Sequence, residues 1–121
     1  MNKSQALHKF WSGFGLPAYD QYTVPDDAQM PYITYSVAED SFERPVALTG
    51  SIWYRSPSWE DIEQKSYEIA RAVKIGGIVV NIEDGFVWIY RGSPFAQRMS
   101  DVDDTVRRIV INITAEFLSA D

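Results

Sequence analysis

The stretch that decides the fold is TVRRIVINITAEFL, which runs from Thr105 to Leu118. Its odd positions from residue 109 to residue 117 are Ile, Ile, Ile, Ala and Phe, and most of the positions between them are polar. Successive side chains of a β-strand point to opposite faces of a sheet, so this alternation predicts a strand with one buried face. We expect this strand to be central to the fold.

Two further strands and a helix are predicted upstream of it. Residues Ile78–Ile82 and Phe86–Tyr90 are rich in β-branched and aromatic residues, and the Asp84-Gly85 pair between them is a strong hairpin signal. Before them, apolar residues recur at helical spacing after Ser58, where Ser58 and Asp61 resemble a capping box. Gly76-Gly77 is expected to end this helix.

The N-terminal half predicts one more helix and two more strands. Apolar residues line one face of a helix over residues 4–14, and residues 19–31 have no period and contain prolines, so we expect a loop there. Alternation at residues 33–37 predicts a strand, and residues 48–55 predict a second strand antiparallel to it.

The order of these elements is α-β-β-α-β-β-β. It predicts an α+β fold with a mixed, mainly antiparallel sheet of about five strands and one or two helices packed on it.

The composition indicates a globular protein and limits its possible partners and compartment. The chain has 121 residues, 45% of them hydrophobic, which suits a single α+β domain over residues 1–121. Its 17 acidic and 11 basic residues give a net charge of -6, which argues against a surface that grips nucleic acid through its phosphates. It has no cysteine, and residues 1–14 have no continuous hydrophobic run, so the cytosol is the expected compartment and no membrane contact is expected.

No residue pattern in the chain predicts a catalytic or cofactor site. His8 is the only histidine, and it stands apart from any serine motif or carboxylate cluster, so a surface or half-buried helix residue is expected rather than a catalytic base. The acidic group Asp101, Asp103 and Asp104 has no glycine and distant glutamate of a calcium loop, and a solvated loop is expected there rather than a metal site. We therefore expect no enzyme activity, no metal and no cofactor.

The segment from Gly92 to Asp104 is the predicted contact region. It is too long for a tight hairpin, so we expect a mobile loop that becomes ordered against a neighbouring subunit. Its side chains can supply apolar anchors and charge-assisted bonds across an oligomer interface. The predicted interface residues are Phe95, Arg98, Met99, Asp101, Asp103 and Asp104.

The aromatic residues allow two interpretations. Trp53, Trp59, Trp88 and the tyrosines can form a stacking platform for nucleic acid or sugar, or they can pack in the core and at a subunit interface. The negative charge and the aliphatic residues beside them favour the core and interface interpretation.

Three features resemble the tail terminators of long-tailed bacteriophages and prophages, also called tail completion or minor tail proteins. They are the run MPYITYS at residues 30–36, the helix after Ser58, and the stretch from Gln97 to Phe117 in which an acidic patch leads into a long alternating strand. The resemblance implies an α+β subunit that forms a closed hexameric ring, caps the tail tube and provides the surface that joins the head. It implies the tail tube protein and the head-completion or connector protein as partners. The protein would then assemble in the host cytoplasm and remain in the virion tail.

Two other functions stay open on the sequence. One is a small enzyme or ligand-binding domain that uses the carboxylates of residues 101–104. The other is a monomeric adaptor that binds a peptide at a sheet edge.

Overall fold

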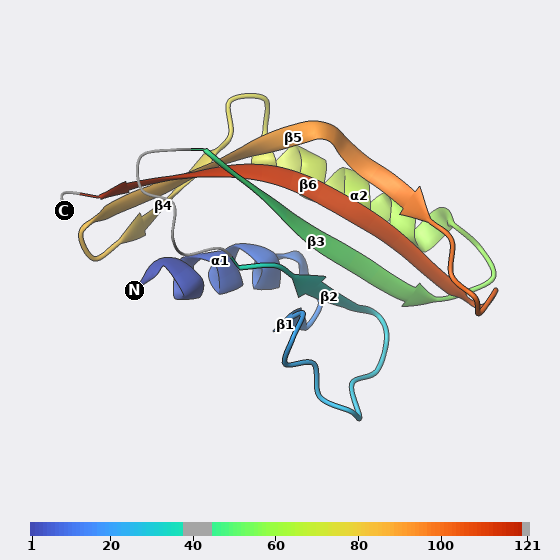
Figure 1. The fold of residues 1–121 in the computed structure, drawn as a ribbon. Coiled ribbons are helices and arrows are strands. Elements are labelled where there is room, and N and C mark those ends of the chain that lie inside the picture. The colour runs from blue at the N-terminus through green and yellow to red at the C-terminus, as the bar shows by residue number, and fades with distance from the viewer. Residues whose placement is uncertain (38–44, 120–121) are drawn as a thin grey trace.

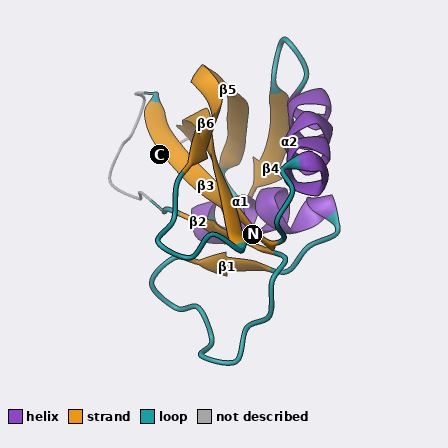
Figure 2. Ribbon diagram, turned by 90° about the vertical axis from the view of Figure 1, so that its right-hand side faces the viewer, coloured by secondary structure: helices purple, strands orange, loops and turns teal. Residues whose placement is uncertain are grey.

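A computed structural model describes residues 1–37 and 45–119, and these form one six-stranded sheet with helices on one side (Figures 1 and 2). The strands lie in the order β1-β2-β3-β6-β5-β4, and every neighbouring pair is antiparallel except β1 with β2. The elements are α1 (Lys3–Trp11), a 3-10 turn η1 (Ser12–Phe14), β1 (Ala18–Asp20), β2 (Tyr32–Tyr35), β3 (Val46–Arg55), α2 (Glu60–Val73), β4 (Ile78–Ile82), β5 (Gly85–Met99) and β6 (Val106–Ser119).

The α+β class and the mainly antiparallel sheet are confirmed, but the strand count and order are not. The structure has six strands in the order α-β-β-β-α-β-β-β, because β1 forms at Ala18–Asp20, partly inside the segment predicted as a loop. This strand is only three residues long, too short to show a period of its own, and it forms by pairing in parallel with β2.

The expected role of the final strand is confirmed. β6 lies between β3 and β5 and pairs with both along most of its length. Its inward residues Ile109, Ile111, Ile113, Ala115 and Phe117 are all buried. They share one hydrophobic core with the apolar faces of α1 and α2, so both helices cover the same face of the sheet (Figure 2).

Close packing between α1 and β3 requires a glycine at residue 50. Trp11 of α1 is fully buried, and a Cβ atom on Gly50 would lie 2.5 Å from the Trp11 ring. The indole ring therefore lies directly on the β3 backbone, which brings the helix close to the sheet.

The second helix begins and ends differently from the prediction. The capping box of Ser58 and Asp61 is not formed; the N-cap is Trp59, and the Ser58 hydroxyl instead accepts a hydrogen bond from the Glu60 N–H at 3.0 Å. The helix ends at Val73, before the two glycines, because Lys74 takes a positive φ of 65°.

Candidate interaction surface

The predicted contact loop is largely a strand. β5 continues to Met99 after a bulge between Arg91 and Ala96, and residues 96–99 pair with Ile111, Val110, Ile109 and Arg108 of β6. Only residues 100–105 form the turn to β6. The expectation of a mobile loop over Gly92–Asp104 was therefore wrong. Gly92 and Pro94 are typical of loops, but β6 supplies the backbone hydrogen bonds that extend this segment.

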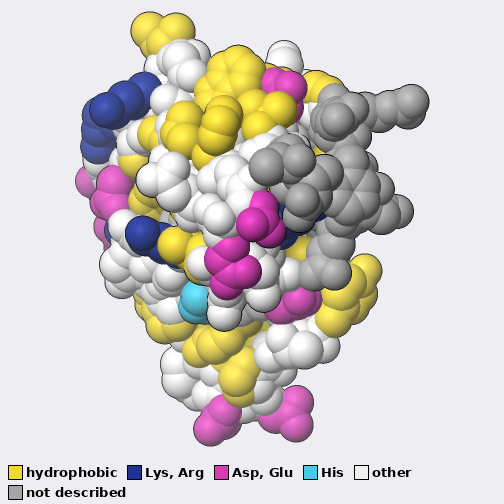
Figure 3. All heavy atoms as spheres, turned by 90° about the vertical axis from the view of Figure 1, so that its left-hand side faces the viewer, with side chains coloured by type: hydrophobic (Ala, Val, Ile, Leu, Met, Phe, Trp, Pro, Cys, Tyr) yellow, Lys and Arg dark blue, Asp and Glu magenta, His cyan; other side chains and the backbone are white. Residues whose placement is uncertain are grey.

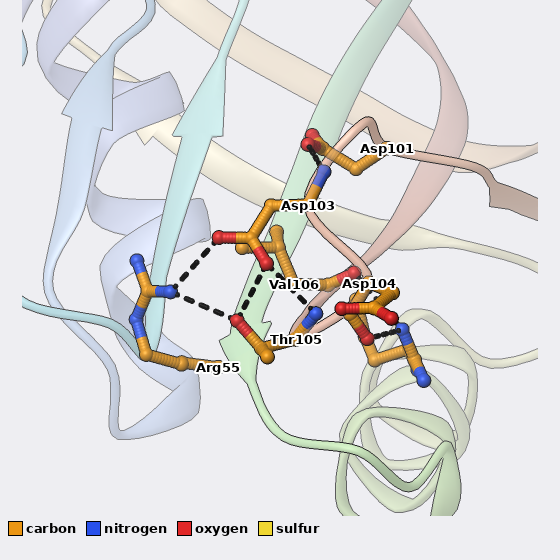
Figure 4. A network of polar contacts seen from close by, with 7 residues as sticks. Arg55, Asp101, Asp103, Asp104, Thr105 and Val106 are labelled. Atoms are coloured by element: carbon orange, nitrogen blue, oxygen red, sulfur yellow. Dashed lines mark hydrogen bonds and ion pairs between the residues drawn. The ribbon is translucent and has the colours of Figure 1, made fainter.

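A polar network fixes the turn between β5 and β6 (Figure 4). One oxygen of the Asp103 carboxylate accepts the Thr105 N–H at 2.9 Å and the Thr105 hydroxyl at 2.7 Å. The other oxygen accepts from Arg55 Nη1 at 3.3 Å, and the Asp103 N–H donates to Asp101 Oδ1 at 3.0 Å. The pKa of Asp103 is held below its ordinary value, mainly by the hydrogen bond from the Thr105 N–H. The hydrogen bond from the Thr105 hydroxyl and the contact with Arg55 lower it further. The carboxylate is thus a structural anchor of the turn.

Two arginines pack against Trp59 at the start of α2. The Arg98 guanidinium lies 4.6 Å from the centre of the Trp59 ring and that of Arg107 lies 5.3 Å from it. Arg98 also donates to Glu63, from Nε at 2.9 Å and from Nη2. Arg107 donates to the backbone oxygens of Asp104, at 2.7 Å, and Pro57, at 2.9 Å. These contacts tie the hairpin end to α2.

The predicted interface residues do not form one cluster. Phe95 lies near the bulge, where it packs on the core and its ring is 5.7 Å from the Arg91 guanidinium. Met99 is 39% exposed, and Val102, which the prediction omitted, is fully exposed in the turn. The hairpin therefore presents exposed apolar side chains on a backbone that the Asp103 network holds in place.

The described residues bring no set of metal ligands together. Among residues 1–37 and 45–119, no three His, Cys, Asp or Glu side chains gather as metal ligands. His8 is exposed on α1, and its Nδ1 lies 3.0 Å from the hydroxyl of Tyr35, a buried residue of β2. Burial, and secondarily the Asp20 charge, raises the pKa of Tyr35.

Two hollows on the surface lie away from the acidic residues of the β5–β6 turn. One, of about 400 Å³, lies between the N-terminus and the β4–β5 turn, and the other, of about 240 Å³, lies between α2 and β5. Asp101, Asp103 and Asp104 line neither of them. A carboxylate enzyme needs its acidic groups in a cleft that holds substrate, so this placement weighs against the enzyme alternative.

The sequence did not indicate how much of the second sheet face stays uncovered. No helix of the described part of the chain packs there, and exposed apolar residues cluster where β4, β5 and β6 meet: Val79 is 59% exposed, and Phe86 lies opposite Leu118 with both 38% exposed. Figure 3 views the end of the molecule that carries the N-terminus and the end of β6, and hydrophobic side chains gather on it. The alternation of residues in β4 and β5 separates the side chains of the two faces. It does not show which of the two faces the helices cover, so the uncovered face could not be predicted from it.

None of the helices in the described residues has the length and hydropathy needed to cross a bilayer.

Comparisons with known proteins give a fold relationship. No protein-family model matches the chain, and no curated protein sequence matches it. The fold is similar to that of a chain in the solved structure of the virion of a native gene transfer agent particle, with a TM-score of 0.68 and 14% sequence identity. The match covers 93% of this chain and 92% of that one. At this identity the likeness concerns the fold, and it extends over nearly the whole of both chains.

Proposed function

We propose that the protein is a structural subunit of the tail of a phage-like particle, and specifically a tail terminator. In this role it forms a closed ring, which is hexameric in the family it resembles. The ring caps the tail tube and provides the surface for joining the head. Its partners are further copies of itself, the tail tube protein and the head-completion or connector protein. It assembles in the bacterial cytoplasm and stays in the virion tail.

The observation that carries this proposal is the shared fold with a chain of a gene transfer agent virion over nearly the full length of both chains. Fold alone does not define function, so the surface must agree with it. The described residues offer an uncovered sheet face with exposed apolar side chains and a hairpin end whose turn is held by Asp103. Such surfaces suit a subunit that acts through contacts.

The hairpin end remains the proposed oligomer interface, with Phe95, Arg98, Met99, Asp101, Asp103 and Asp104 as its predicted residues. Deleting part of this segment would remove backbone pairs with β6, so side-chain substitutions are the better probe. We expect the double variant Met99→Asp and Val102→Asp to stay folded, because both side chains are exposed, and to lose ring formation. Ile75→Asp, in the exposed turn between α2 and β4, is the control for an acidic side chain placed at an exposed apolar position.

The test of the function itself is removal of the gene from a bacterium that produces the particles. Electron microscopy is then expected to show tails of uncontrolled length that are not joined to heads, and the restored wild-type gene should return normal particles. Normal particles without the gene would contradict the proposed function.

A further inference from the structure

In the part of the chain that the structure describes, the sheet has an unpaired strand edge on each of its two sides. Among these residues, β5 pairs only with β6 beyond Ile89, because its pairing with β4 ends at the Ile78–Ile89 pair. On the opposite side, β1 pairs only with β2 within the described residues. An open edge presents backbone N–H and C=O groups that can pair with another strand. Both edges are thus able to accept a strand.

The edge at residues 96–99 is accessible. Ala96, Gln97, Arg98 and Met99 are all exposed. The hollow of about 240 Å³ lies between α2 and the helix-covered face of β5 and β6, because Ile109 also lines it. Pro94 in the same strand segment fits an edge position, because proline cannot donate to a ladder. The described residues place no strand beside this edge, so a second strand can approach it in the plane of the sheet.

The segments that contain the two edges differ in charge, because β1 contains Asp20 and the loop after it contains Asp26 and Asp27. Residues 90–99 contain Arg91 and Arg98 and no acidic residue, whereas residues 18–31 contain Asp20, Asp26 and Asp27 and no basic residue. Arg98 is paired with Glu63 of α2, which reduces the charge at one end of the β5 edge. Figure 3 shows acidic side chains at the lower tip, where the β1–β2 loop projects from the body. Opposite charges favour contact between the two edges and disfavour contact of either edge with itself.

Strand direction is also compatible. Through the antiparallel pairs β5–β6, β6–β3 and β3–β2 and the parallel pair β2–β1, β1 runs opposite to β5. In a ring whose axis follows the strands, all copies have the same strand direction, so β1 of one copy lies antiparallel to β5 of the next.

We propose that residues 96–99 of β5 pair with β1 of a neighbouring copy, so that the sheet continues from subunit to subunit. The contact joins two different surfaces, which is the arrangement that closes a ring. This inference rests on the proposed function, because it names the contact by which the ring forms.

The register of the sheet selects the residues for a test. Tyr19, Thr34, Ser51, Val110 and Gln97 form one row across five strands on the uncovered face. In a continued sheet, Tyr19 of the neighbouring copy would stand next to Gln97 in this row. If the register is shifted by two residues, Tyr19 of the neighbouring copy would stand next to Met99 instead. The chain has no native cysteine, so introduced pairs report only on this contact.

The experiment oxidises the assembled double variants Tyr19→Cys with Gln97→Cys and Tyr19→Cys with Met99→Cys. At least one of them is expected to give a ladder of covalent multimers that ends at the size of the ring. Asn81→Cys with Gln97→Cys is the control, because β4 and β5 belong to the same side of the sheet, and it should give no such ladder. Each variant is first checked for an unchanged melting temperature.

Hydrogen exchange of the unmodified protein gives a second measurement. Every second amide of residues 96–99 points away from β6, and these amides are expected to exchange rapidly in the dilute protein and at least tenfold more slowly in the ring. Rings that form without the cross-links or this protection would overturn the sheet contact and leave the proposed function standing. Protection by another virion protein but not by further copies would also overturn it, in favour of peptide binding at the edge. A chain that never self-associates would contradict both proposals.

Discussion

The two halves of β5 share one partner strand but differ in their other surroundings. Residues 85–89 lie between β4 and β6, and Val87 and Ile89 are fully buried. Residues 92–99 have β6 on one side, no strand on the other within the described chain, and no buried side chain. The first half is therefore stabilised by side-chain burial, whereas the second is held in strand form mainly by backbone pairing with β6.

The largest effect is expected from a charge in the strand that both halves share. Ile111 is fully buried and pairs with Ala96 of the second half and with Gly50 of β3. Ile111→Asp removes about 1.5–3 kcal/mol of burial and places a carboxylate in the core, so the domain should not fold. Circular dichroism and solubility measure this, with the exposed Thr49→Asp as control. An unchanged melting temperature would mean that the buried face is wrongly assigned.

Truncation in each half should separate the two sources of stability. Ile89→Ala in the first half should lower the free energy of unfolding by about 2–5 kcal/mol, as for other large-to-small core changes. Arg98→Ala in the second half should lower it by less than about 1 kcal/mol, because the Arg98 side chain is 54% exposed in its ion pair with Glu63. Chemical denaturation gives both values. Equal losses would show that side chains stabilise both halves alike.

A smaller effect is expected at the bulge of the second half. The Asn112 amide donates to the Pro94 backbone oxygen at 2.9 Å, and Asn112→Ala should lower the free energy of unfolding by about 0.5–1.5 kcal/mol. Thr114→Ala is the control, because Thr114 lies opposite Tyr90, before the bulge. Hydrogen exchange should become faster near residue 94 only in the Asn112 variant. An equal change in both variants would show that the Asn112 hydrogen bond does not stabilise the bulge.

The smallest effect is a pH dependence of the turn that follows the second half. The pKa of Asp103 is lower in the folded protein than its ordinary value. Its contribution to stability is therefore present above the ordinary aspartate range near pH 4 and is lost as the pH falls through the lower folded pKa. Asp103→Asn should remove this part of the acid dependence, measured as melting temperature against pH, while Asp26→Asn should keep it. Identical profiles for wild type and Asp103→Asn would contradict the anchoring role.

The same contrast explains what the sequence predicted. The strand at residues 105–118 was predicted because its inward side chains alternate and are buried, and the β4–β5 hairpin was predicted from Asp84-Gly85 and the apolar runs around it. Residues 92–99 and β1 were missed because neither has an alternating pattern; each is a strand only through the backbone groups of a neighbour distant in sequence.

The candidate interface was predicted only in part. Residue types at 95–104 indicated contact chemistry, and the structure places Arg98 and Asp103 in fixed networks with Glu63 and Arg55. The free edges could not be predicted, because an edge is defined by the strands that are absent beside it. The exposed Val102 gave no signal, since a single apolar residue in an acidic segment has no period.

The proposed function requires the chain to close into a ring with copies of itself. Native mass spectrometry across a concentration series is the direct test. We expect one discrete oligomer, whose mass is a fixed multiple of the 13.8 kDa chain and does not increase with further concentration, because a closed ring has no free contact. A monomer at every concentration, or a ladder of species that keeps growing, would contradict it.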